Sequence, residues 1–384
     1  MNPRWIAAAL PLLAVPASGT DREPAFPYER WTVGPPVLRA GPAGAFDDVA
    51  VKDPSIVFYG GKYHLFYTSK CSRETAAALT ARGVPVARSR SGTGYVSAPS
   101  LEELNTAPHH NLSEIVGEAV IAPQVFYFRP QNLWYLVAHR NIRDSLALGP
   151  IYLTNPDIRD VRQWTAPKNL LPEPPAGIFW IDFRVICDDT KAHLFYTDHR
   201  GSLFRLESPL KDFPGGLYAA ARRRLRLGPD HGIAETVLTE RGEDSRGQWR
   251  LHEAGSVYHV RSANKYLALA EAIRPHPTRA PYWDSRNRFM FALVADRIEG
   301  PWDRAERHRN EFAGDPPRLF DAAGAKSHCG QVSHFTLLRP GFDESMEIDD
   351  FRLTLVFQAF DPSNTPDNFV YDDLPWEILV MRNH

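Results

Sequence analysis

The sequence predicts an all-β fold, a five-bladed β-propeller, from a repeated hairpin, its regular spacing and the scarcity of helical periodicity. Four clear strand–turn–strand units begin at Ser55, Gln124, Arg184 and Ser256, and a weaker fifth begins at His334. Each pairs two apolar or alternating runs across a turn made mostly of polar, Gly or Pro residues, which is the pattern of a β-hairpin. The hairpin is therefore the repeating unit of the fold.

The spacing of these hairpins fits propeller blades. The intervals between Val57, Val125, Val185 and Val257 are 68, 60 and 72 residues. Such intervals leave room after each hairpin for the outer strands of a four-stranded blade. About 365 residues follow the N-terminal segment, enough for about five blades, so we expect one propeller domain over 20–384.

Composition excludes several classes of protein. Hydrophobic residues make up 43% and charged residues 23%, as in a folded globular protein. The formal charge is only -2, so nucleic acid is not an expected partner. The one dense basic cluster, 222–226, is predicted to be a solvated loop because Gly and Pro surround it. Three cysteines, Cys71, Cys187 and Cys329, match no zinc spacing and are expected to be buried hydrophobes.

The N-terminal segment resembles a secretory signal. One Arg precedes about eleven apolar residues, and the small residues Ala17, Ser18 and Gly19 follow. We therefore expect a signal peptide over 1–19 and a secreted or periplasmic protein. The apolar run is too short to span a membrane, so no membrane partner is expected. The Pro- and Gly-rich segment from Thr20 to about Phe46 is expected to wrap the outside of the domain.

Three acidic residues stand at similar places before the hairpins. Asp53 lies four residues before Val57, Asp182 three before Val185, and Glu253 four before Val257. Because the inner strands of a propeller begin around the central axis, these carboxylates are expected to converge on one pocket. Each acid alone could simply cap a turn. Three in register instead favour a catalytic site.

Converging carboxylates suit glycoside hydrolysis. Like charges brought together resist ionising together, so one carboxyl group can stay protonated beside an ionised one. Cleavage of a glycosidic bond needs such a pair, an acid for the leaving oxygen and a base for water or attack on the sugar.

At these residues the sequence resembles glycoside hydrolase family 62, the α-L-arabinofuranosidases acting on arabinoxylan, and more distantly family 43. The similar segments cover most of the chain and occur in the family's order. They are residues 51–57, 121–134, 180–190, 203–215, 252–260, 299–302, 332–334 and 371–376.

The resemblance implies roles for particular residues. It makes Asp53 the general base, Glu253 the general acid, and Asp182 the aspartate that tunes the acid and orients the sugar, in a reaction that inverts configuration. Lys52 would contact sugar hydroxyls beside the base. Tyr371 would contact the arabinose or the neighbouring xylose.

Two further residues are candidates with alternatives. The resemblance places His334 near the axis, where the family often holds a calcium ion, so a metal role is one reading and a hydrogen-bonded loop residue the other. No cofactor is expected for the chemistry itself. Trp180 could stack against a sugar ring, or it could pack in the core.

The chain also departs from the family pattern. Phe335 and Thr336 follow the Ser-His pair where Gly and an acid are usual, and Phe291 stands where members carry an arginine. His139 replaces a common glutamine, and Asp372 follows Tyr371 in place of the usual polar partner. These positions shape the pocket rim, so the exact polysaccharide stays open.

Three functions are compatible with the sequence. The first is an exported α-L-arabinofuranosidase, a monomer whose partner is arabinoxylan or a related hemicellulose. The second is a β-xylosidase or arabinanase like those of family 43. The third is a sugar-binding propeller without catalysis, which retention of all three acids disfavours.

Overall fold

The structure is a computed structural model. The residues it describes are 31–141, 148–173, 179–198, 200–226, 234–239, 241–244, 247–275, 283–304, 319–320, 331–361 and 370–383. The predicted signal peptide over 1–19 and Cys329 lie outside these residues.

Two sheets of four consecutive strands are formed by the first half of the chain. The first has the order β2 (Ala50–Tyr59), β3 (Lys62–Lys70), β4 (Ser91–Ala98) and β5 (His110–Asn111). The second has the order β6 (Ile121–Phe128), β7 (Leu133–Asn141), β8 (Leu148–Asn155) and β9 (Lys168–Asn169). Neighbouring strands are antiparallel, as the predicted hairpins require.

Two more sheets of consecutive strands follow. One contains β10 (Ile181–Cys187), β11 (Lys191–Thr197), β12 (Ser202–Pro209) and β13 (Glu235–Thr239). The other contains β14 (Arg241–Asp244), β15 (Gly247–Val260), β16 (Lys265–Pro275), β17 (Trp283–Ala295) and β18 (Asp303–Arg304). The short strand β21 (Glu347–Ile348) adds to β15 in parallel.

The fifth sheet joins the two ends of the described chain. Its order is β19 (Leu319–Phe320), β1 (Trp31–Val33), β23 (Glu377–Asn383), β22 (Thr354–Phe360) and β20 (Gln331–Leu337). Part of the segment predicted to wrap the outside is thus β1, which pairs antiparallel with the C-terminal strand β23. Hydrogen bonds between these strands hold the N-terminal part of the domain to its C-terminal end.

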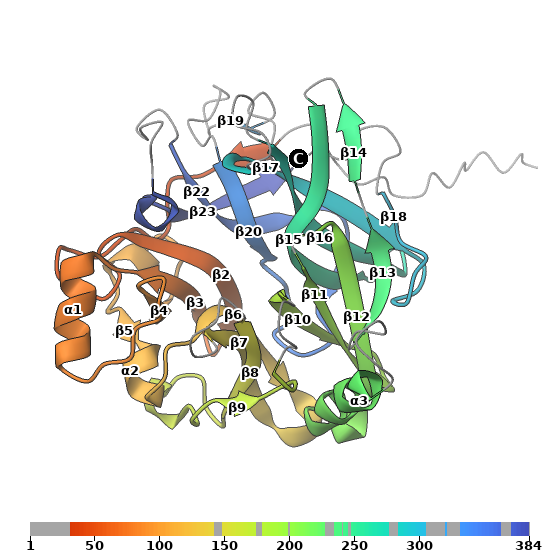
Figure 1. The fold of residues 1–384 in the computed structure, drawn as a ribbon, viewed down its shortest axis with the longest axis horizontal. Helices are drawn as coiled ribbons and strands as arrows, with labels where there is room; N and C mark the ends of the chain where they lie inside the picture. The colour runs from red at the N-terminus through yellow and green to blue at the C-terminus, as the bar shows by residue number, and fades with distance from the viewer. Residues whose placement is uncertain are drawn as a thin grey trace, which may run out of the picture.

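The all-β propeller is confirmed, but the predicted five blades are not, because the described residues show four blades. The sheets lie in a ring in Figure 1, with β2, β6, β10, β15 and β20 toward its middle. Strand β2 contacts β6 and β20, and β15 contacts β10 and β20. Four sheets, rather than five, consist of consecutive strands, because the remaining one takes strands from both ends of the chain.

The inner strands share a local irregularity near their starts. The pairing register shifts in β2, β6, β10, β15 and β20. At four of these shifts one residue adopts a left-handed backbone, with φ of 48° at Asp53, 51° at Ala122, 59° at Asp182 and 38° at His334. Such conformations are costly for residues other than Gly and typically occur at functional sites. Each bulge changes the direction of one side chain relative to the regular strand.

The core lies between the sheets. The largest hydrophobic cluster includes Phe183, Phe195, Leu251 and Leu269, and it joins the third, fourth and fifth sheets. A second cluster, which includes Phe66 and Trp134, joins the first two sheets. Alternating apolar residues of the hairpins therefore pack sheet against sheet, which gives the site a rigid frame.

Helices are few, but they are more than the sequence suggested. Among the described residues they are α1 (Arg73–Ala81), α2 (Leu112–Val116), α3 (Gly215–Leu225), and 3-10 turns at Leu104–Thr106, Arg129–Gln131, Val161–Gln163, Leu210–Asp212 and Tyr371–Asp373. Most of the basic cluster 222–226 lies in α3, so the predicted loop is wrong.

Helix α3 forms because its apolar residues Leu217, Ala220 and Ala221 are buried on one side while arginines occupy the other. Cys71 and Cys187 are buried free thiols, as expected. No helix among the described residues is long and apolar enough to cross a membrane.

Candidate active site

The three acids predicted from the sequence meet in one pocket. The pocket has a volume of about 310 Å³. Asp53, Asp182 and Glu253 line it, from three different sheets. Of the other candidates, Lys52, His334 and Tyr371 line it as well. The expected convergence near the inner strands is therefore observed.

Asp53 is held as a carboxylate. Its exposed fraction is 5%, and burial alone would raise its pKa. Lys52 Nζ, 3.8 Å from Oδ1, and His334 Nδ1, 3.6 Å from the same oxygen, outweigh burial, so the pKa is lowered. Within the described part of the chain this oxygen has no hydrogen-bond partner. It is therefore a buried acceptor that no described donor satisfies.

The Asp53 backbone is fixed by another sheet. Its N–H donates to Gln358 Oε1 at 2.6 Å, across the boundary between the first and fifth sheets. Gln358 Nε2 in turn donates to Ser333 Oγ at 3.1 Å. These bonds hold the left-handed residue in place.

Asp182 is fully buried and is also held as a carboxylate. Burial opposes its charge, but His334 Nε2 lies 3.1 Å from its Oδ2 and lowers its pKa strongly. Its backbone N–H donates to His139 Nε2 at 3.2 Å. Burial lowers the pKa of His139 to about 4, so this imidazole is neutral and accepts that bond.

His334 is a buried cation between carboxylates. Its Nδ1 lies 3.1 Å from Glu271 Oε1, in addition to the contacts with Asp182 and Asp53. Burial alone would lower its pKa, but the three carboxylates raise it well above the usual range. An imidazolium has no lone pair for a metal.

Glu271 is a fourth carboxylate that the sequence analysis missed. It lies on β16 directly opposite Glu253 on β15 and is completely buried. Burial would raise its pKa, but His334 and Arg288 lower it, so Glu271 is ionised. Its oxygen also accepts from Ser333 Oγ at 2.9 Å.

Glu253 contacts two possible hydrogen-bond donors. Arg288 Nη1 lies 2.5 Å from its Oε2, and the same nitrogen donates to Glu271 at 2.9 Å. His252 Nε2 lies 3.3 Å from the other Glu253 oxygen. Arg288 also lies 5.8 Å from the centre of the Tyr371 ring. One guanidinium therefore serves two facing carboxyl groups.

The rim of the pocket is basic and aromatic. Lys52 Nζ donates to Tyr371 Oη at 3.3 Å and lies 5.1 Å from the centre of its ring. Lys70 pairs with Asp372 at 2.5 Å, and burial together with Lys52 lowers the pKa of Lys70 to about 8. Asp372, which departs from the family pattern, thus compensates a buried lysine.

Trp180 does not belong to this pocket. Its exposed fraction is 4%, and its ring packs 5.8 Å from that of Tyr196 within the largest hydrophobic cluster. It is not among the residues that line the pocket. Of the two readings, core packing is the one observed, because the side chain points between sheets rather than toward the axis.

The donors around His334 do not fit calcium. One ligand atom each of Asp182, Glu253 and His334 lies within 4.8 Å of the others, a spacing that could hold an ion. Calcium takes oxygen ligands, however, and His334 is an imidazolium already bound to carboxylates. The cation that balances the carboxylates at this place is His334 itself.

The site contains more carboxyl groups than cations. Asp53, Asp182 and Glu271 are kept ionised, and Lys52, His334 and Arg288 supply three positive charges. Glu253 is the fourth carboxyl group, and it shares the Arg288 guanidinium with Glu271, which faces it.

Sequence reasoning missed Glu271, Arg288, Ser333 and Gln358. One signal was present, because Glu271 interrupts the apolar run Leu267–Ile273 and Arg288 stands opposite that run on the next strand. A charged residue inside a buried strand is rarely tolerated without a partner. Ser333 and Gln358 carried no such signal. The side chain of Phe291 is not among those described.

Comparisons with known proteins agree on one family. The model of glycosyl hydrolase family 62 matches residues 48–382. Alpha-L-arabinofuranosidase C of Cellvibrio japonicus is 30% identical over 355 residues, which cover 92% of this chain and 47% of that protein. The chain therefore spans about half the length of this curated relative.

Two solved structures are similar over nearly their whole length. The catalytic domain of a family 62 α-L-arabinofuranosidase from Coprinopsis cinerea is 27% identical, with a TM-score of 0.71, over 92% of this chain and 97% of that one. A family 62 hydrolase in complex with xylotriose is 26% identical, with a TM-score of 0.71, over 94% and 98%.

Proposed function

The chain belongs to glycosyl hydrolase family 62 and is a glycoside hydrolase, and on this basis we propose that it releases α-L-arabinofuranosyl side groups from arabinoxylan-type polysaccharide with inversion of configuration. The relatives named above as α-L-arabinofuranosidases support arabinose as the released sugar. The xylotriose bound by a similar hydrolase supports a xylan backbone as the acceptor side.

The observation that carries the proposed mechanism is the division of charge among the four carboxyl groups. Asp53 is ionised by Lys52 and His334 and has a buried oxygen without a hydrogen bond among the described residues. We propose that Glu253, which shares Arg288 with the ionised Glu271, carries the proton. One ionised and one protonated group are what inverting hydrolysis requires.

In this mechanism Asp53 removes a proton from a water molecule as the water attacks the anomeric carbon. Glu253 donates its proton to the glycosidic oxygen as the bond to the xylan breaks. Asp182, held by His334, accepts hydrogen bonds from the sugar hydroxyls and stabilises the positive charge that develops on the sugar. We expect the Asp53 and Glu253 carboxyl groups to lie about 6.5 to 9.5 Å apart, which leaves space for the water.

Lys52 and Tyr371 are proposed to bind substrate at the rim. Lys52 keeps its charge because Asp53 and Tyr371 raise its pKa against the effect of burial. Its ammonium group can donate to a sugar hydroxyl beside the base, and the ring of Tyr371 offers a face to arabinose or xylose. No cofactor is needed for these steps.

Several properties of the whole protein stay proposals. We propose that residues 1–19 direct export, so that the enzyme is secreted or periplasmic. We propose that residues 20–384 form one catalytic domain that acts as a monomer, in which the sheet made from both chain ends serves as a fifth blade. Contacts of β20 with β2 and β15 support this closure.

The alternative is a β-xylosidase or arabinanase activity on the same acids. Arabinoxylan, linear arabinan and aryl glycosides of arabinofuranose and xylopyranose, assayed for released monosaccharide, separate these activities. Arabinose from arabinoxylan and from the aryl arabinofuranoside, but not xylose, is the expected result. Xylose release from the aryl xyloside would instead favour the alternative.

Variants then test the role of Glu253. We expect Glu253→Gln to lower arabinose release from arabinoxylan by about 100-fold or more, because the leaving alkoxide needs protonation. The loss should be much smaller on an arabinofuranoside of an acidic phenol. The exposed Glu102→Gln is the matched control and should retain activity. Equal losses on both substrates would remove the acid role from Glu253.

A further inference from the structure

A second, smaller cavity is enclosed by the inner strands. Its volume is about 20 Å³, and Ser55, Gln124, Arg184, Ser256 and Thr336 line it, one from each sheet. Ser55, Arg184 and Thr336 come two residues after Asp53, Asp182 and His334. The cavity therefore lies on the axis, beside the catalytic pocket, and it is large enough for about one water-sized particle.

Arg184 brings a positive charge to this cavity. Its exposed fraction is 6%, and its Nη1 donates only to the backbone oxygens of Phe183 at 3.1 Å and Ala122 at 3.4 Å. Among the described residues it forms no ion pair with a carboxylate. Its charge is compensated only partly by carbonyl dipoles and by the more distant Asp182.

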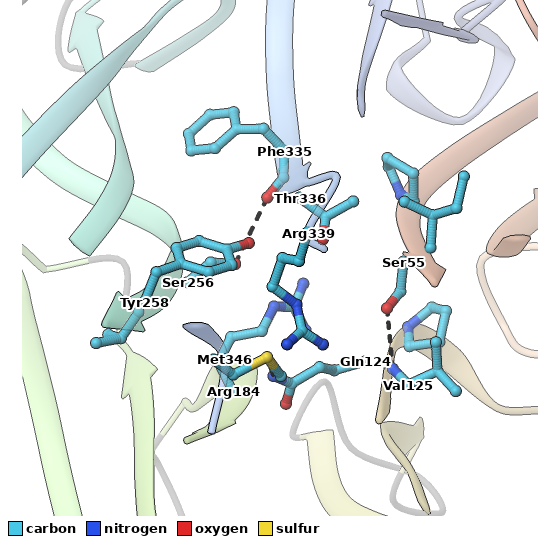
Figure 2. Close-up of a pocket in the computed structure, with 14 residues that line it drawn as sticks. Ser55, Gln124, Val125, Arg184, Ser256, Tyr258, Phe335, Thr336, Arg339 and Met346 are labelled. Carbon is cyan, nitrogen blue, oxygen red and sulfur yellow. Dashed lines mark hydrogen bonds between the residues drawn. The ribbon is translucent and has the colours of Figure 1, made fainter. Parts of the chain in front are cut away.

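Arg339 brings a second positive charge. Its exposed fraction is 7%, and its Nη1 donates to the backbone oxygen of Asp343 at 3.1 Å. The carboxylates of Asp343 and Glu344 contact Arg129, at 3.5 and 3.2 Å, and act on Arg339 only electrostatically. Burial lowers the pKa of Arg339, which reflects the cost of its charge there. Figure 2 shows both guanidinium groups pointing into the middle of the cavity.

The other polar groups around the cavity are already engaged. Gln124 exchanges hydrogen bonds with the backbone of Val185, at 2.6 and 2.9 Å. The Ser55 hydroxyl accepts from Val125 N at 2.9 Å. No carboxylate is among the residues that line the cavity. The walls thus present two cations and no anion.

We propose that this axial cavity binds a small monoatomic anion of the chloride type, held between Arg184 and Arg339. Two buried guanidinium groups beside one cavity are costly without a counter-ion. The volume suits a single halide ion and is too small for a sugar phosphate or a carboxylic acid. This site lies beside the catalytic pocket, and the proposal does not depend on the proposed substrate.

The anion should affect both stability and the neighbouring pocket. Because a ligand that binds only the folded state stabilises it, chloride should raise the melting temperature. Because Arg184 acts electrostatically on Asp182, filling the site should also alter kcat more than KM. Calcium in the same cavity would face two guanidinium groups, which repel it.

Two measurements on the wild-type protein test the site directly. Thermal unfolding is compared in sodium chloride, bromide and gluconate at equal ionic strength, and crystals grown in bromide are examined for anomalous scattering. We expect the melting temperature to rise by about 2 °C or more in halide over gluconate. We also expect a bromide peak between the two guanidinium groups.

A variant adds a matched comparison. Arg339→Gln should abolish the difference between halide and gluconate, whereas Arg352→Gln, which removes an exposed arginine, should keep it. If Arg339→Gln does not fold, the wild-type measurements still decide the matter. Equal melting temperatures in all three salts, with no bromide peak, would mean that only water fills the cavity and would overturn the proposal.

Discussion

Removing the charge of Arg288 should make the enzyme active at higher pH. Arg288 Nη1 lies 2.5 Å from Glu253 and 2.9 Å from Glu271, and this contact favours the ionised form of Glu253. The proposed mechanism needs the protonated form. The same guanidinium therefore works against protonation of the acid, and Arg288→Gln should shift the basic limb of the pH–rate profile upward.

The size of the shift follows from Coulomb attraction. Two unit charges about 4 Å apart attract by about 4 kcal/mol at an effective dielectric constant of about 20. Arg288 divides its charge between two carboxylates, so only part of this energy acts on Glu253. Even a third of it, about 1.4 kcal/mol, corresponds to about one pH unit. We expect the basic limb to rise by about one unit or more.

The assay is kcat/KM against pH on an aryl arabinofuranoside with a poor leaving group, which requires the acid. Arg288→Lys keeps the charge and is the matched control, whose limb should stay near that of the wild type. Loss of the buried pair with Glu271 should also lower stability by about 3 to 5 kcal/mol, so unfolding is measured in parallel. A folded Arg288→Gln enzyme whose basic limb is unmoved, or moves down, would refute this reasoning.

Three other variants test the remaining charges. Asp53→Asn should fold and lose turnover by several orders of magnitude on every substrate; appreciable residual turnover would count against the base role. Asp182→Asn should slow the reaction and move the basic limb toward acid, because an ionised Asp182 disfavours the charge on Glu253; a slower enzyme with an unmoved limb would mean that Asp182 only positions substrate. His334→Gln should lower the melting temperature most below about pH 6.5. The difference in melting temperature from the wild type should shrink as pH rises, because the raised pKa of His334 gives stability that is lost on deprotonation. A difference that stays constant from pH 5 to 9 would contradict this.

The hairpins and the three acids were predictable because both depend on local sequence. Each hairpin shows strand periodicity and a turn, and Asp53, Asp182 and Glu253 keep similar distances from it. The propeller topology brings the starts of the inner strands together, so acids at similar positions before different hairpins lie close together in space. Asp53 and Asp182 even share the same left-handed backbone.

The composite sheet and α3 were not predictable in the same way. Strand β1 is only three residues long and has no hairpin partner of its own, since it pairs with β23 at the other end of the chain. Helix α3 is short and rich in arginine, and only its packing side makes it a helix. In both cases a tertiary interaction determines the secondary structure, and the local sequence has no pattern that predicts that interaction.

The electrostatics of the site could not be read from sequence because they depend on which charges share a buried space. Reasoning from the acids alone assigns their protonation to mutual repulsion. The structure adds His334, which lies among three carboxylates, and Arg288, which bridges Glu253 and Glu271. Asp53, Asp182 and Glu271 are therefore held ionised by neighbouring cations, and Glu253 is the carboxyl group that we propose as the acid.

This arrangement also explains how His334 serves the proposed mechanism without taking part in bond making or breaking. It holds Asp182 at 3.1 Å, stands 3.6 Å from Asp53, and connects through Ser333 to Gln358, which fixes the backbone of Asp53. A calcium ion at this place would supply charge but no directed hydrogen bonds. A protonated histidine supplies both, so Asp53, the proposed base, and Asp182, the aspartate proposed to orient the sugar, are kept ionised and aligned by one side chain from a different sheet.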